Sequence, residues 1–124
     1  MKNKERPILA DLVNAGTLDI EKFQNEIIRP IIKMQHHLLV ASFQNYLQKR
    51  KIDFSNLTEQ KKRSRISSIY KTDNNFKNLT LGFIIGHFSL DEFAFYTANI
   101  SEVHKRVLQI TTQRIKDSIL ELKL

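Results

Sequence analysis

The densest run of side chains that could bind a ligand lies between residues 49 and 65, in the stretch KRKIDFSNLTEQKKRSR. It holds seven basic and two acidic residues. Lysine and arginine side chains neutralise phosphate groups, so this pattern predicts contact with a phosphate-bearing partner. The predicted anion-binding and nucleic-acid-binding residues are Lys49, Arg50, Lys51, Lys61, Lys62, Arg63 and Arg65.

The distribution of charge supports this prediction more than the total does. The chain of 124 residues carries a formal net charge of +7, and residues 49–77 contribute nine basic and three acidic residues to it. A solvated protein surface usually mixes charges of both signs. The alternative is a charged outer face whose basic residues complement a helix dipole. The sequence leaves both interpretations open, and it favours contact through the backbone and shape of RNA, DNA or a ribonucleoprotein over base-specific recognition.

A second polar row accompanies the apolar side chains of residues 20–47. Arg29, Lys33 and then His36 or His37 follow one another at steps of three or four, so on a helix they share one edge. Such a row could line an interface or a cleft. The alternative is an ordinary solvated edge beside the apolar face.

Metal and cofactor chemistry receive little support. Adjacent histidines on a helix point about 100° apart, so His36 and His37 are not expected to chelate one ion easily. The sequence contains no cysteine, no HExxH or HxxxH pattern, no phosphate-binding glycine loop and no GxSxG elbow. We therefore expect no metal and no cofactor, with structural or surface histidines favoured over the alternative of a metal site assembled from separate helices. The sequence gives more support for binding than for catalysis.

The elements that must carry these residues are helical, since apolar residues recur at steps of three and four. We predict an all-α, compact bundle of about five helices that forms a single domain over residues 1–124, with residues 1–16 as an N-terminal arm. A long first helix is expected over residues 18–49. Pro30 lies inside it and predicts a kink or break near residues 27–29, or else two helices with Pro30 in the first turn of the second.

The remaining helices are expected near residues 58–71, 74–86, 90–98 and 100–122. Thr58 is a predicted N-cap, and Ser89 with Glu92 forms a predicted capping box. Asn99 and Glu102 offer a similar cap to the last helix. No apolar stretch approaches the roughly 20 residues that cross a bilayer, so we expect no membrane partner and a soluble, cytoplasmic protein.

The stretches FQNEIIRPIIKMQHHLLVASFQNYL and GFIIGHFSLDEFAFYTAN resemble a family of small uncharacterised bacterial helical proteins, some of which are automatically labelled glyoxalase. The resemblance implies that His87 also belongs to an interface or cleft. The glyoxalase label implies a metal-dependent βαβββ fold with ligands on strands. The helical pattern and the absent metal spacing depart from that fold, so no catalytic residue is carried over.

These observations predict a small binding protein that engages nucleic acid or a nucleoprotein assembly through residues 49–77. One alternative is a protein-interaction or assembly module, such as a helical homodimer formed through the wide apolar face of residues 20–47. A second alternative is a glyoxalase-like small-molecule enzyme centred on His87, His104 and nearby carboxylates.

Overall fold

The computed structural model describes residues 20–122, and these residues form helices and connecting turns with no strand. The predicted arm of residues 1–16 lies outside the described range. The all-α prediction is confirmed. The elements are α1 (Ile20–Phe23), η1 (Gln24–Ile28), α2 (Arg29–Met34), α3 (His36–Lys49), α4 (Glu59–Thr72), α5 (Asn74–Ile85), α6 (Leu90–Ala98), α7 (Ile100–Asp117) and η2 (Ile119–Glu121).

The first three elements form one continuous helix whose middle turn is widened. In η1, a π-helical turn, the backbone N–H of Arg29 donates to the carbonyl of Gln24, five residues earlier. Pro30 follows directly, in the first turn of α2. Proline has no N–H to donate and its ring presses on the carbonyl four residues back, so the turn before it opens. The distortion predicted at Pro30 therefore occurs as a π-turn.

The true break in the first long segment lies at Gln35. This residue ends α2 and begins α3 with φ −95° and ψ 13°. The long helix is thus divided, and the described residues form six helices when α1, η1 and α2 are counted as one. After the break, Leu39 faces the core and is 1% exposed, whereas its neighbour Leu38 is 41% exposed.

Side-chain caps begin the next three helices. The Thr58 hydroxyl accepts from the amide of Lys61, and Asp73 accepts from the amide of Phe76. At α6 the predicted capping box is present: Ser89 Oγ accepts from the Glu92 amide, and Glu92 accepts from the Ser89 amide. These caps satisfy amides that have no partner inside the helix.

The cap predicted at Asn99 is wrong. Its side-chain amide donates to the carbonyl of Phe95, so it closes α6 and makes no cap to α7. Glu102 pairs with Arg106. The predicted end of the last helix is also corrected, because α7 stops at Asp117. The Ser118 hydroxyl turns back to the Arg114 carbonyl, and the 3-10 turn η2 follows.

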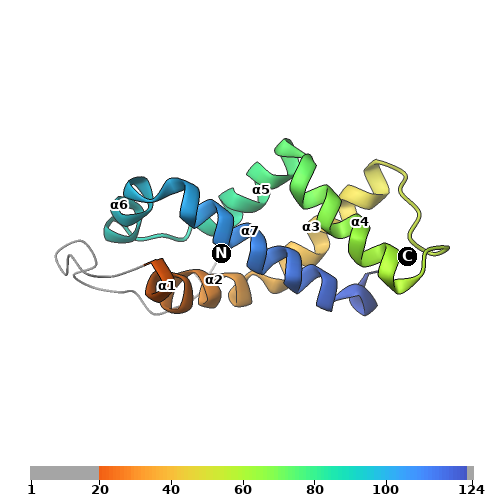
Figure 1. Ribbon diagram of the computed structural model, residues 1–124, viewed down its shortest axis with the longest axis horizontal. Helices are drawn as coiled ribbons and strands as arrows, with labels where there is room; N and C mark the ends of the chain where they lie inside the picture. The colour runs from red at the N-terminus through yellow and green to blue at the C-terminus, as the bar shows by residue number, and fades with distance from the viewer. Residues whose placement is uncertain (1–19, 123–124) are drawn as a thin grey trace.

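Helix α7 crosses the molecule diagonally and packs against elements from every part of the fold (Figure 1). It contacts η1, α2 and α3 as well as α4, α5 and α6. Its Val103, Val107 and Ile115 are fully buried among the apolar side chains of those helices. Because α4 lies along α7, polar residues at the edges of these two helices are brought together. No helix in the described part of the chain is both long enough and apolar enough to cross a membrane.

Candidate nucleic-acid interface

The first basic group surrounds the end of α3. Lys49 is the last residue of that helix, Arg50 is its C-cap and Lys51 follows with a positive φ of 55°. The amide of Lys51 donates to the Gln48 carbonyl, and the amide of Ile52 donates to the Leu47 carbonyl. This is a Schellman arrangement, in which glycine usually occupies the left-handed position. All three basic side chains lie at the surface.

Arg50 is already engaged within the chain. Its guanidinium lies 3.2 Å from Asp73 Oδ2 and 4.9 Å from the ring centre of Tyr46. The Tyr46 hydroxyl donates to the same carboxylate at 2.7 Å. The Phe76 amide, the Tyr46 hydroxyl and the Arg50 charge hold the pKa of Asp73 below its usual value. Burial, and then the Asp73 carboxylate, raise the pKa of Tyr46.

The second basic group occupies the first turns of α4, and only part of it lies near the first group. Arg65 and Ser68 line the same hollow of about 640 Å³ as Arg50. Arg63 is directed elsewhere, toward Glu59 at 3.5 Å and Asp117 of α7 at 3.6 Å. Lys61 is exposed and Lys62 is half-buried.

A third basic surface lies between α4, α5 and α7, and we call it the lysine groove. It is an open hollow of about 520 Å³. Its residues are Ser67, Tyr70, Lys71, Lys77, Lys105, Leu108, Gln109, Thr112, Gln113 and Lys116. Four of these are lysines and none is acidic. No carboxylate among the described residues forms an ion pair with any of the four.

None of the four groove lysines is among the seven contact residues predicted from the sequence. Lys71 and Lys77 lie within the basic segment 49–77, whereas the other two are distant from it in sequence. Lys105 and Lys116 belong to a segment with no net charge, so the local charge count does not reveal them. A helical pattern could have found them, since Lys105, Gln109, Thr112 and Lys116 follow at steps of three or four. That pattern alone does not show that α4 and α5 place Lys71 and Lys77 opposite.

The predicted row on the first helices is divided by the break at Gln35. Arg29 lines a hollow of about 470 Å³ together with Gln24 and Arg114. Lys33 is exposed. His36 lies on the other side of the break and contacts Arg114, whose guanidinium Nη1 is 3.2 Å from His36 Nδ1.

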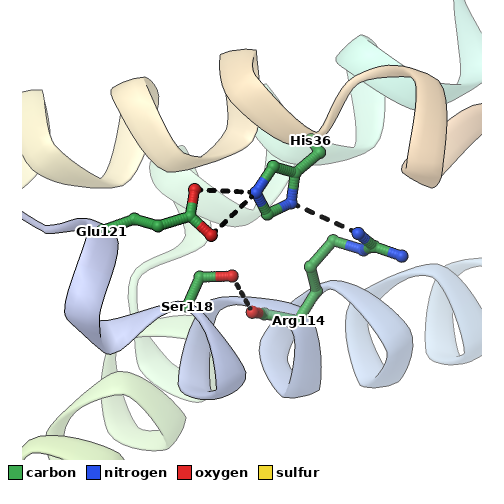
Figure 2. A network of polar contacts seen from close by, with 4 residues as sticks. All are labelled: His36, Arg114, Ser118 and Glu121. Carbon is green, nitrogen blue, oxygen red and sulfur yellow. Dashed lines mark hydrogen bonds and ion pairs between the residues drawn. The ribbon is translucent and has the colours of Figure 1, made fainter.

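His36 also contacts Glu121, near the end of the described chain. Figure 2 shows the His36 ring between Arg114 and Glu121, whose two carboxylate oxygens lie 2.9 and 3.1 Å from His36 Nε2. Donor atoms of His36, His37 and Glu121 all lie within 4.8 Å of one another, so this group could hold a metal ion.

His87 and His104 each contact a different side chain. The Nε2 atoms of His87 and Gln35 are 2.7 Å apart. His104 Nε2 lies 2.7 Å from the Tyr96 hydroxyl, and burial lowers the pKa of His104. Neither contact joins a nucleophile to a base and an orienting acid, which is the arrangement that acyl chemistry requires. The βαβββ fold of the glyoxalase label needs strands, and residues 20–122 form none.

The wide apolar face of residues 20–47 is covered by the chain's own helices. Its main side chains are 0–2% exposed, and they are Phe23, Ile27, Ile28, Ile31, Ile32, Leu39, Phe43 and Leu47. The width of this face therefore gives no argument for a homodimer. Three of the exposed large apolar residues lie on α6 and at the start of α7, where Leu90 is 88%, Phe93 45% and Ile100 44% exposed. The other three within residues 20–122 are Leu38, Leu79 and Leu120, on α3, α5 and η2.

Comparison of the chain with protein-family models, with curated proteins and with solved structures gives no match.

Proposed function

We propose that this protein binds nucleic acid, free or in a nucleoprotein assembly, through the phosphate backbone. The observation that carries the proposal is the lysine groove, in which Lys71, Lys77, Lys105 and Lys116 surround one open hollow without an acidic residue in its lining. Amine groups without carboxylate partners repel one another and attract a polyanion. Ser67, Thr112 and the two glutamines add neutral donors that suit phosphate oxygens.

The basic residues predicted from the sequence lie outside the lining of the lysine groove. Lys61 is exposed on the first turn of α4, the helix that also carries Lys71. Arg63 lies one turn before Ser67 of the groove, but it is shared between Glu59 and Asp117. Arg50 is held by Asp73 at the other hollow. We therefore assign the main phosphate contacts to the groove and the supporting contacts to the unpaired lysines of α3 and α4.

Recognition is expected to be independent of base sequence. Tyr70 is the aromatic residue of the groove, and it is 3% exposed. A buried ring offers no platform for base stacking, which proteins of the single-strand-binding class use. Contact through backbone charge and shape is the mode that remains for these side chains.

The salt dependence of binding tests the proposal. A fluorescent duplex RNA and a duplex DNA of unrelated sequence are titrated with the full chain at several salt concentrations between 50 and 200 mM. If the four groove lysines each neutralise one phosphate, the plot of log K against log salt has a slope of about −4. The proposal would be rejected if the protein bound neither duplex at 50 mM salt, or if added salt did not weaken the binding.

A second candidate function is protein assembly through α6. The observation that favours it is the exposure of Leu90, Phe93 and Ile100, which lie close together in sequence on two consecutive elements. Exposed apolar clusters often mark contacts with other proteins. Sizing of the protein in high salt distinguishes the two functions, since assembly through apolar contacts persists there and polyanion binding does not.

A further inference from the structure

Three side chains that carry metal-binding donor atoms lie close together between the first turn of α3 and the end of η2. His36 Nε2 and Glu121 Oε1 are 2.9 Å apart, although 85 positions separate these residues. His37 lies beside His36 with 5.2 Å between the ring centres. We propose that His36, His37 and Glu121 bind one divalent ion of the zinc class.

The donor set defines which ions the site would take. Two imidazole nitrogens and one carboxylate oxygen suit Zn²⁺ and its neighbours Co²⁺, Ni²⁺ and Cu²⁺. Mg²⁺ and Ca²⁺ prefer oxygen ligands alone. Three protein ligands leave the fourth tetrahedral position for water.

The spacing of the donor atoms is compatible with one ion. Ligand atoms about 2.1 Å from a tetrahedral ion lie about 3.4 Å from one another. His36 Nε2 and the two Glu121 oxygens, at 2.9 and 3.1 Å, need to separate only slightly to admit an ion between them. The donor atoms of all three residues lie within 4.8 Å of one another. Because His37 is exposed, its ring can turn toward the same ion.

Arg114 opposes the ion through the tautomer of His36. The guanidinium can only donate, so the Nδ1 atom that it contacts at 3.2 Å must accept. The ring proton of neutral His36 then resides on Nε2 and is donated to Glu121, as the dashed lines of Figure 2 indicate. Binding of a metal to Nε2 requires this proton to move to Nδ1, which can then no longer accept from the guanidinium, so Arg114 is displaced. The positive charge of Arg114 disfavours the ion as well.

The test uses the full chain without a histidine tag, titrated with ZnCl₂ by calorimetry at pH 7 and with CoCl₂ by visible absorption. We expect one equivalent of Zn²⁺ to bind and Co²⁺ to give tetrahedral absorption bands. His37→Ala and Glu121→Gln should each weaken Zn²⁺ binding by about tenfold or more. The control Glu21→Gln removes another exposed carboxylate, from α1, and should leave the affinity unchanged.

Arg114→Gln provides a result that simple loss of a ligand cannot produce, because it should tighten Zn²⁺ binding. His37 and Glu121 are exposed, so their variants are expected to keep the far-ultraviolet helical signal of the parent. Absence of Zn²⁺ binding by the parent chain would overturn the proposal. Equal affinity of the parent and both ligand variants would also overturn it, as would Mg²⁺ binding as tightly as Zn²⁺.

Discussion

The side-chain Nε2 atoms of Gln35 and His87 lie 2.7 Å apart, across 52 positions of sequence. Gln35 is 6% exposed and occupies the break between α2 and α3, where its backbone amide is shared between the carbonyls of Ile31 and Ile32. His87 follows the end of α5. The contact therefore joins the break in the first long segment to the end of a helix from the middle of the chain.

Replacing Gln35 by methionine removes this polar contact at nearly constant volume. We expect Gln35→Met to lower the free energy of unfolding by about 1–3 kcal/mol, because His87 loses a buried partner. Urea unfolding followed by circular dichroism measures the change. Gln48→Met, on the exposed side of α3, is the control and should change stability by less than about 0.5 kcal/mol. If the two substitutions changed the free energy of unfolding equally, the contact between Gln35 and His87 would not stabilise the fold.

Lys51 tests the local geometry at the end of α3. Its φ of 55° is unfavourable for a residue with a Cβ atom, and glycine relieves that cost. Lys51→Gly is therefore predicted to stabilise the protein by about 0.5–1 kcal/mol. Lys49→Gly, at the last residue of α3, loses the same charge from a helical position and should destabilise by up to a similar amount. Thermal unfolding of both variants checks the opposite signs, and destabilisation by Lys51→Gly would contradict the Schellman assignment.

Asp73 gives the protein a predictable dependence on pH. The folded chain holds the pKa of Asp73 below its ordinary value, through the Phe76 amide first and then through Tyr46 and Arg50. Its stabilising contribution is therefore complete above the unfolded pKa of about 3.9 and is lost as the pH falls through the lower folded pKa. Asp73→Asn should lower the melting temperature at pH 7, and the difference from the parent should shrink toward pH 3. A difference that stays constant from pH 7 to pH 3 would refute this account.

The sequence predicted the helical class and the segments of α4 to α6, because apolar spacing and caps such as Ser89 with Glu92 are local signals. It did not predict that the long helix would break at Gln35, since no proline or glycine marks that position and its contact partner His87 is 52 residues away. Asn99 illustrates the same limit. Its side chain can serve either neighbouring helix, and the fold assigns it to the carbonyl of Phe95.

The candidate site was predictable only where charge is dense in sequence. The stretch 49–65 led to Arg50 and Arg65, which do line one hollow. The pairing of Arg50 with Asp73 and of Arg63 with Asp117 was not predictable, because both carboxylates come from other elements. Lys105 and Lys116 join the lysine groove through the packing of α7 against α4 and α5, which is a tertiary property.

A pair of matched double variants tests whether the lysine groove contacts phosphate. Lys71→Gln with Lys105→Gln removes one exposed lysine from each side of the groove, whereas Lys22→Gln with Lys33→Gln removes two exposed lysines outside it. The salt dependence of duplex binding is then measured for the parent and both variants. We expect the groove variant to bind more weakly and its log-log salt slope to be smaller in magnitude by about 2, while the control keeps the slope of the parent. Equal slopes for the two double variants would contradict contact between the groove and phosphate.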